Sequence, residues 1–403
     1  MDITVLVPAH NEEQTIGQTI ESLLAQTRLP DQIIIIANGC TDQTVEVAKK
    51  YPVIVMDLPR LKHRKSEAMN TGWNLYGRDS DLVVSMDADT VLAPNAIEDW
   101  EKESWKRLFG GSTSKFTIQQ PGFWCRLQKS EYAYNIQQGL NNGWTNVLAG
   151  AGSAFSGRAL REIAARDDRE GPWSYESAVE DYELTYRLRE AGYKTYVSTT
   201  VRAYTDGMKN LKSLWGQRMK WQAGTLQDLL RFGVNHLTIR DWVSQMLNLA
   251  GPVIRALWVM VVSLALYLDA LTIIWWGLLV PLLFIAINFK IALRVPFKDK
   301  WDILIAVTIV PKEILACVRG GWILASWMEI LRKKITHKER DLWAAQYKAE
   351  GEAMLGVNVA AGLVAGIAAT GLAVGSMALF ILGGIFVVIG LFTLLKRDSS
   401  NRP

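Results

Sequence analysis

Two acidic pairs are the residues of this sequence whose type and spacing best suit chemistry. Asp87 and Asp89 follow the apolar run 82–86 and are separated only by Ala88. If that run is a strand, both carboxylates face one crevice while Ala88 points away. Hard oxygen ligands of this kind suit Mg²⁺ or Mn²⁺. A D-x-D tripeptide taken alone is more often a solvated turn, and its place after a buried strand favours the metal site.

Glu180 and Asp181 form the second pair and open a helical pattern that ends at Gly192. Acidic residues at a helix N-terminus also interact favourably with the helix dipole, so a purely structural role is an open alternative. The functional interpretation is a carboxylate that acts as a general base.

Basic and aromatic residues supply the remaining candidates. Lys65 ends the basic run 62–65 before a helix, where it could neutralise a diphosphate or lie on a solvated surface. Gln217, Lys220 and Trp221 share one helical face at spacings of three and four. That face either meets a membrane interface or forms a site in which Trp221 stacks on a sugar and cations, including Arg218, meet phosphate.

The elements that must position these residues alternate. Short apolar runs at 3–7, 33–36, 53–56 and 82–86 predict strands, and the segments 15–26, 45–50 and 67–75 predict helices. This order predicts an α/β domain with a parallel sheet covered on both faces. Ligands of such sheets bind beyond the carboxyl ends of the strands. Polar residues gather at those ends: Asn11 and Glu12 after a first strand stopped by Pro8, Asn38 after the second, and Asp87 and Asp89 after the fourth.

Composition excludes several classes of protein. The chain has 403 residues and a formal net charge of +4, which is too small to argue for a nucleic-acid partner. Its three cysteines lie far apart, which excludes a disulfide framework and a C-x-x-C zinc site. The 16 tryptophans are unusual, because this residue is enriched at lipid interfaces.

The apolar residues concentrate in the second half of the chain. The stretches 252–268, 271–289, 355–374 and 376–395 are each close to the ~20 apolar residues of a membrane-spanning helix. Lys and Arg lie in the longer connectors and after the last stretch, which places the first half in the cytoplasm. Arg255 is the charge inside the first stretch, near its start, where it could snorkel.

These patterns predict three parts. Residues 1–210 form a cytoplasmic catalytic domain, 211–250 form interfacial amphipathic helices, and 251–403 form a multi-pass region in the cell membrane. Within the last part, charges interrupt the segment 302–331, for which we expect helices lying in the interface. Strand-like residues begin at Ile3, so we expect no N-terminal signal peptide.

Seven motifs in order resemble those of the membrane-bound family-2 glycosyltransferases, the group that includes cellulose, chitin and hyaluronan synthases. One such match is weak, whereas seven in the same order make coincidence implausible. The segments are Val7–Glu12 (P-x-x-N-E), Asn38–Asp42, Lys65–Gly72 (K-x-x-A-x-N-x-G), Asp87–Thr90 (D-x-D), Gly150–Arg158, Glu180–Asp181 (T-E-D) and Gln217–Trp221 (Q-x-x-R-W).

The resemblance implies a GT-A-type domain followed by about four membrane spans and interfacial helices. It implies an inverting, metal-dependent transfer of a sugar from a nucleotide diphosphate, most simply UDP, to a glycan or lipid-linked acceptor at the cytoplasmic membrane face. A homo-oligomer stays open. The implied roles are nucleotide binding for Pro8, Asn11, Glu12, Asn38, Lys65 and Asp87; binding of Mg²⁺ or Mn²⁺ for Asp87 and Asp89; catalysis for Asp181 with Glu180; and diphosphate or acceptor contacts for Gln217, Arg218, Lys220 and Trp221.

Three positions depart from the family pattern. Ala37-Asn38 replaces Asp-Asp, so an amide replaces the carboxylate that the family pattern places against the nucleobase of the donor. Val179 replaces the Thr of T-E-D and leaves the acid pair intact. Lys220 replaces the Arg of Q-x-x-R-W, which keeps the charge but loses bidentate phosphate recognition.

Two other functions stay open at this point. Four spans are few for a polymer channel, which favours either an oligomer or a single-transfer enzyme that glycosylates a lipid carrier. A scaffold that only binds nucleotide sugar is the second alternative. An ion-coupled transporter is disfavoured, because the predicted spans lack mid-membrane Asp and Glu.

Overall fold

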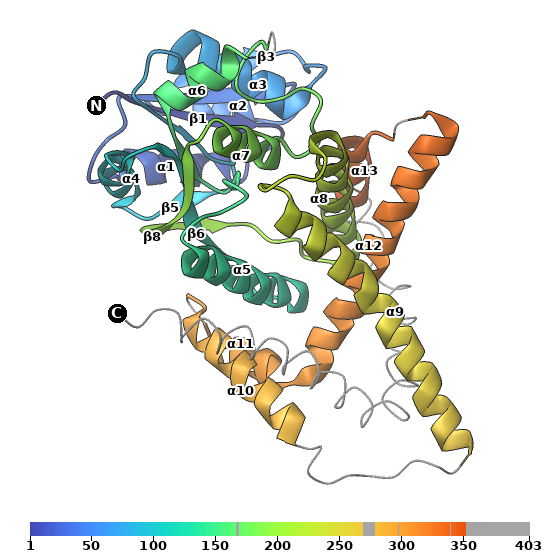
Figure 1. Ribbon diagram of the computed structural model, residues 1–403. Helices are drawn as coiled ribbons and strands as arrows, with labels where there is room; N and C mark the ends of the chain where they lie inside the picture. The colour runs from blue at the N-terminus through green and yellow to red at the C-terminus, as the bar shows by residue number, and fades with distance from the viewer. Residues whose placement is uncertain (167–168, 269–278, 297, 339, 352–403) are drawn as a thin grey trace. The chain divides into compact units, whose positions relative to one another are not determined.

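The computed structural model describes residues 1–166, 169–268, 279–296, 298–338 and 340–351 (Figure 1). The chain divides into two compact units. Unit 1 comprises Met1–Lys209 and Ala223–Ile239, and unit 2 comprises Asn210–Gln222 and the described residues from Arg240 onward. Helix α8 (Leu211–Phe232) therefore contributes its first half to unit 2 and its second half to unit 1.

Unit 1 is built on a mixed sheet of eight strands within the described residues, in the order β3-β2-β1-β4-β7-β6-β8-β5. The first four strands in this order are parallel, and β7 runs antiparallel to both β4 and β6. The predicted α/β class with a parallel-rich sheet is confirmed. The strands are β1 (Ile3–Ala9), β2 (Gln32–Asn38), β3 (Ile54–Leu58), β4 (Leu82–Ser85), β5 (Val91–Leu92), β6 (Phe109–Ile118), β7 (Ser153–Ser156) and β8 (Lys194–Thr205).

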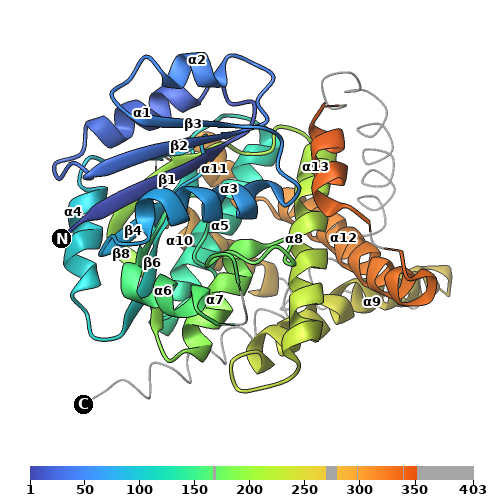
Figure 2. The same ribbon diagram turned by 90° about the horizontal axis from the view of Figure 1, so that it is seen from above.

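Helices cover both faces of this sheet (Figure 2). Alternation along the buried run of β2 sends Ile33 and Ile35 to one face and Ile34 and Ile36 to the other, so each face has its own apolar core. Helices α1 (Ile16–Leu24), α2 (Thr44–Ala48) and α4 (Ala96–Ser104) complete the first core, and α3 (Arg64–Gly72), α6 (Gly157–Ala164) and α7 (Glu180–Glu190) complete the second. Unit 1 also contains α5 (Phe123–Asn142).

The predicted end of the first strand was wrong, and Asn38, expected after the second strand, is the last residue of β2. We expected Pro8 to stop the first strand, but β1 continues to Ala9, and Pro8 pairs in register with Ile36. The neighbour on the other side, β4, ends its pairing with β1 at Leu6. Proline, which has no N–H to donate, is tolerated because only one neighbouring strand remains at this position.

The part of unit 2 that the structure describes is helical: α9 (Ile239–Tyr267), α10 (Leu279–Arg294), α11 (Lys300–Val307), α12 (Ile309–Thr336) and α13 (Leu342–Gly351). Two stretches among the described residues, Ile239–Ala265 and Val310–Thr336, are helices long and apolar enough to cross a membrane. The first includes most of the predicted span 252–268. The second covers most of 302–331, so this segment meets the length requirement of a span, and its interfacial position stays a prediction.

The other predicted spans are described in part or not at all. Helix α10 covers the second half of 271–289, whereas 355–374 and 376–395 lie outside the described residues. A contact between the two long helices was not expected. Arg255 Nε of α9 lies 3.2 Å from Glu313 Oε2 of α12, so this arginine has a charged partner in the same unit.

Candidate active site

Lys65 joins two of the predicted motifs. Its Nζ lies 2.6 Å from Asp87 Oδ1, after β4, and 3.2 Å from Glu180 Oε1, at the start of α7. Burial alone would lower the pKa of Lys65, but the charges of Asp87, Glu180 and Asp181 raise it above its usual value. The lysine is therefore held as a cation between the D-x-D segment and the second acidic pair.

Gly150 forms one wall of this ion pair. A Cβ placed there would lie 2.9 Å from both Asp87 Oδ2 and Lys65 Nζ. The carbonyl of Gly150 also accepts a hydrogen bond from the backbone N–H of Asp87 at 2.9 Å. With any other residue here one of the two charged groups would have to shift, which accounts for the glycine in the Gly150–Arg158 motif.

Asp89 lies beside Asp87 and close to further acidic side chains. Ala88, between them, is 3% exposed and belongs to the core, as the alternation predicted. Burial, together with the charges of Asp87, Glu12 and Asp206, raises the pKa of Asp89 to about 7. Thr90 and Thr205 hydroxyls donate to its Oδ1, each at 3.2 Å. Such a concentration of negative charge is relieved by a cation.

The residues present fit a divalent metal that shares its coordination with substrate. Asp87 and Asp89 offer carboxylate oxygens, the ligands preferred by Mg²⁺ and Mn²⁺. Within the described ranges, no three His, Cys, Asp or Glu side chains come together as a complete metal site. A metal held here would thus need oxygens from a bound ligand, and substrate phosphates commonly provide them for Mg²⁺.

The predicted nucleoside contacts lie at the carboxyl ends of β1 and β2 and in the loop after β1. Asn11, with φ of 59°, accepts a hydrogen bond from the Thr41 N–H at 2.8 Å through Oδ1. The buried Asn38 accepts one from the Leu61 N–H at 2.9 Å. Glu12 receives the Thr15 hydroxyl at 2.6 Å. The structure thus gives the two Asn amide oxygens a role in ordering the loops, whereas contacts to a base remain a prediction, as they do for Pro8.

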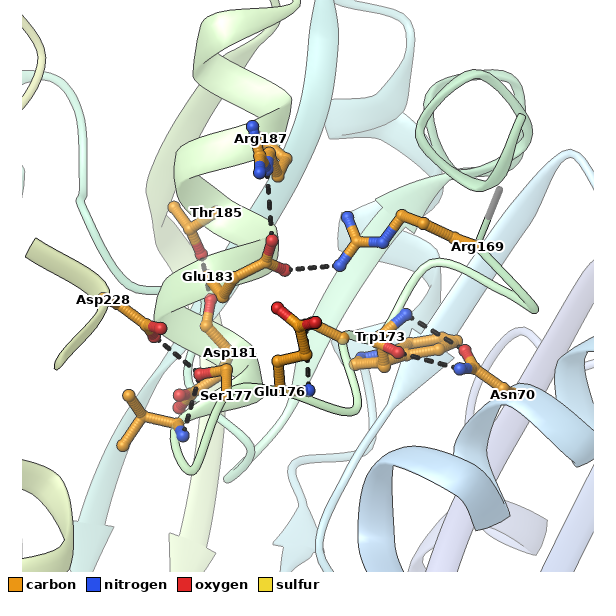
Figure 3. A network of polar contacts seen from close by, with 12 residues as sticks. Asn70, Arg169, Trp173, Glu176, Ser177, Asp181, Glu183, Thr185, Arg187 and Asp228 are labelled. Carbon is orange, nitrogen blue, oxygen red and sulfur yellow. Dashed lines mark hydrogen bonds and ion pairs between the residues drawn. The ribbon is translucent and has the colours of Figure 1, made fainter. Parts of the chain in front are cut away.

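Asp181 lies in the first turn of α7 (Figure 3). Its Oδ1 accepts the N–H of Tyr182 at 2.8 Å, and its carbonyl accepts the Thr185 hydroxyl at 2.6 Å. In the same first turn, the buried Glu183 binds Arg169 at 2.8 Å and Arg187 at 3.1 Å. These contacts fix the helix that carries the predicted base.

A third side-chain amide, that of Asn70, fixes the loop before α7. Asn70 of α3 donates to the Trp173 carbonyl at 2.8 Å and accepts from the Trp173 N–H at 3.0 Å (Figure 3). The Asn of the K-x-x-A-x-N-x-G motif thus joins the helix that begins near Lys65 to the loop that leads to Asp181.

The residues Gln217, Arg218, Lys220 and Trp221 belong to unit 2, whereas the residues described above belong to unit 1. Arg218 and Lys220 are buried. Lys220 Nζ lies 3.1 Å from the ring centre of Trp343 in α13, and the Arg218 guanidinium lies 4.5 Å from the ring centre of Trp221. Gln217 Oε1 is buried and has no hydrogen-bond partner among the residues that the structure describes.

Several residues of the site were not predicted from sequence. Asp206 adds negative charge near Asp89, and Arg169 binds Glu183. Asp228 and Ser177 hydrogen-bond across 51 positions of sequence at 2.6 Å. The sequence feature that could have indicated Asp228 is its position between Leu226 and Leu229, both of which are buried in α8.

Two family models match the chain. Glycosyl transferase family 2 matches residues 4–103, and glycosyl transferase family group 2 matches residues 82–288. Among curated proteins, poly-beta-1,6-N-acetyl-D-glucosamine synthase of Staphylococcus aureus (strain COL) is 26% identical over 277 residues, which cover 66% of this chain and 64% of that protein. The Staphylococcus epidermidis synthase is 27% identical over 243 residues, which cover 57% and 56%. The matched stretches thus span less than two thirds of these relatives.

Solved structures give distant matches. The mannosyltransferase PcManGT of Pyrobaculum calidifontis, in complex with GDP-Man and Mn²⁺, is 16% identical, covers 96% of this chain and 86% of its own, and has a TM-score of 0.46. Glucosyl-3-phosphoglycerate synthase of Mycobacterium tuberculosis, with Mn²⁺, UDP and phosphoglyceric acid, is 18% identical over 58% of this chain and 79% of its own, with a TM-score of 0.38.

Proposed function

Because the chain belongs to glycosyl transferase family group 2, and is a glycosyltransferase related to a polysaccharide synthase, we propose that it transfers a sugar from a UDP-linked donor to a glycan hydroxyl with inversion. In this reaction the acceptor oxygen attacks the anomeric carbon from the face opposite the diphosphate. The bond from that carbon to the β-phosphate oxygen breaks, and UDP leaves with the electron pair. Asp181 takes the proton of the acceptor hydroxyl.

The observation that carries this proposal is the Lys65 bridge. It ties Asp87, a candidate donor-side ligand, to Glu180, which adjoins the base. The ammonium of Lys65 would lie beside a diphosphate and oppose its charge. Asp87 and Asp89 would hold Mg²⁺ or Mn²⁺, which acts as a Lewis acid on the leaving diphosphate when bound. Glu12, Pro8, Asn11 and Asn38 would border the nucleoside.

The remaining roles rest on the motif resemblance. Gln217, Arg218, Lys220 and Trp221 are proposed to contact the diphosphate and acceptor. The multi-pass location, with residues 1–210 as a cytoplasmic catalytic domain, 211–250 at the interface and 251–403 in the membrane, is supported by two apolar helices of spanning length. A polymer product is supported by the kinship to a poly-N-acetylglucosamine synthase.

The experiment is release of UDP by the purified full chain, with Asp181→Asn beside wild type. We expect Asp181→Asn to lower kcat for transfer by about 10²–10⁴-fold, the usual contribution of a general base, and to leave UDP binding unchanged. Asp79→Asn, at an exposed position, is the control and should match wild type. Full turnover by Asp181→Asn would show that the base is assigned wrongly.

Metal removal gives a second test. We expect EDTA to abolish transfer and added Mn²⁺ or Mg²⁺ to restore it, because the carboxylates of Asp87 and Asp89 repel a diphosphate and Lys65 alone does not offset both charges. Full activity in excess EDTA would contradict the metal assignment.

The length of the product separates the two transferase alternatives. A ladder on a gel indicates processive synthesis, whereas one lipid-linked band indicates single transfer to a carrier. UDP-sugar binding without turnover of any donor tested would instead support a scaffold.

A further inference from the structure

A buried carboxylate outside the predicted motifs contacts the loop that precedes α7. Asp228, in the half of α8 that belongs to unit 1, is 1% exposed. Its Oδ2 accepts the hydroxyl of Ser177 at 2.6 Å (Figure 3). Arg231 Nη1 lies 3.8 Å from Oδ1, and within the described residues this oxygen accepts no hydrogen bond. Burying a carboxylate costs free energy, which indicates that the Asp228 carboxylate serves a function at this position.

The hydrogen bond continues to the start of α7. Ser177 Oγ accepts the backbone N–H of Val179 at 3.1 Å. Val179 is the N-cap of α7, and its carbonyl accepts the N–H groups of Tyr182 and Glu183 at 3.1 and 3.2 Å. The relay from Asp228 through Ser177 therefore ends two residues before Asp181 and sets where the helix begins.

Further contacts press the same half of α8 against α7 and its preceding loop. A Cβ at Gly224 would lie 3.1 Å from both methyl carbons of Val179, so the glycine permits this close approach. Phe232 stacks on Tyr186, with ring centres 3.8 Å apart and an interplanar angle of 9°. Arg231 donates to the Glu176 carbonyl at 3.1 Å. The Asp228 relay is thus the polar part of an extended packed contact.

We propose that Asp228 is a positioning residue for the glycosyl transfer: by holding Ser177, and through it the Val179 N-cap, it orients Asp181 toward the acceptor hydroxyl. This inference rests on the proposed function of Asp181 as base. Asp228 is only 1% exposed, so in this proposal it acts through Ser177 and not by contact with substrate. A displacement of about 1 Å at a reacting group can cost 10²-fold in rate, which is the scale of effect that such positioning has.

The test compares Asp228→Ala, Asp228→Asn and Ser177→Ala in the purified full chain. We expect Asp228→Ala and Ser177→Ala each to lower kcat for transfer at least about tenfold, with the Kd for UDP unchanged within about twofold. Asp228→Asn keeps an oxygen that accepts the Ser177 hydroxyl, so it should stay within about threefold of wild type. Gln227→Ala, on the same turn of α8, is the matched control and should behave as wild type.

A double-mutant cycle separates a relay from two independent defects. If Asp228 acts through Ser177, Asp228→Ala combined with Ser177→Ala lowers kcat no further than either change alone. Multiplying losses would overturn the proposal. So would wild-type kcat in Ser177→Ala, a variant that removes one hydroxyl and keeps the proposal testable even if Asp228→Ala does not fold.

The two levels of inference fail differently. If Asp181→Asn is as active as wild type, both the assignment of Asp181 as base and the positioning role of Asp228 are wrong. An inactive Asp181→Asn, combined with wild-type kcat in Ser177→Ala and in Asp228→Ala, overturns the positioning role and leaves the base assignment standing.

Discussion

Lys65 balances the charges on which the candidate site depends. Asp87 and Glu180 contact its ammonium at 2.6 and 3.2 Å, and these carboxylates raise its pKa against the effect of burial. The lysine therefore stays protonated across the pH range in which an enzyme works. In the proposed reaction, a diphosphate would meet a cation already held in place, so little reorganisation would be needed.

Gly150 offers a direct test of this arrangement. In Gly150→Ala the new methyl would lie 2.9 Å from Asp87 Oδ2 and from Lys65 Nζ, so one of them must move. We expect transfer to fall at least about tenfold, since misplaced groups lose much of their catalytic effect, while the melting temperature stays close to wild type. Ala151→Gly, which removes a methyl from the same loop, is the control. Wild-type transfer by Gly150→Ala would show that the ion pair tolerates displacement.

Asp228 makes stability depend on pH. Burial raises its pKa from an ordinary 3.8 to about 7; Ser177 and Arg231 oppose this shift, while Glu183 and Asp181 add to it. The folded state thus binds more protons than the unfolded state between about pH 4 and 7. The free energy of unfolding therefore falls as pH rises through this window, by up to about 4 kcal/mol for three pH units.

Asp228→Asn removes this titration. We expect the melting temperature of Asp228→Asn minus that of wild type to be more positive at pH 8 than at pH 5. At pH 8 wild type carries a buried charge at this position, and Asp228→Asn does not. Glu13→Gln, at an exposed position, should show no such trend. Parallel melting curves for Asp228→Asn and wild type at both pH values would contradict the shift.

At the scale of elements, the sequence was informative wherever structure is local. The apolar runs gave β1, β2, β3 and β4 in parallel pairs, and the motifs placed Lys65, Asp87 and Glu180 at ends of elements that meet. Strand ends were less predictable. Pro8 is tolerated within β1 because the pairing between β1 and β4 has already ended at Leu6. The hydrophobic pattern contains no information on where a neighbouring strand ends.

Contacts between distant elements carried no local signal. Nothing around Ser177 indicates that Asp228 lies 2.6 Å away, and nothing around Asn70 indicates that it binds both backbone groups of Trp173. Such pairs depend on how α3, α7 and α8 pack, which is decided by the buried apolar faces of all three helices together. Conversely, the predicted nucleoside residues Asn11 and Asn38 were foreseen by position, whereas their hydrogen bonds to the loops were not.

Helix α13 supplies a partner for Lys220. The ammonium lies 3.1 Å from the centre of the Trp343 ring, where cation–π attraction is strong because the lysine is buried. We expect Trp343→Leu to lower the free energy of unfolding by about 2 kcal/mol in the wild-type background. In the Lys220→Met background the same change should lower it much less, because the cation is already absent. The coupling energy from chemical denaturation of the four proteins in this cycle is the measurement. A value near zero would show that the contact is packing alone.

At the scale of the whole molecule, the overall composition is an average over two unlike parts of the chain. The first half of the chain is an α/β domain with charges throughout, and the second contains two apolar helical stretches of 27 residues each among its described residues. Large apolar side chains such as Leu257, Met260 and Val261 of α9 are more than half exposed. A helix with this surface suits lipid better than water, which agrees with the proposed membrane location.

The ion pair between the two apolar helices tests that location. Arg255 and Glu313 are 3.2 Å apart, and an isolated charge deep in a bilayer costs about 2.5–3.5 kcal/mol. In membranes we therefore expect Arg255→Gln to destabilise the chain, because Glu313 loses its partner. Arg255→Gln with Glu313→Gln should recover most of the loss, since no charge is then left alone. Melting temperatures in lipid nanodiscs compare the three variants with wild type. Water screens exposed charges and makes such pairs worth less than about 1 kcal/mol, so equal melting temperatures for Arg255→Gln and wild type would indicate that α9 and α12 face water at this level.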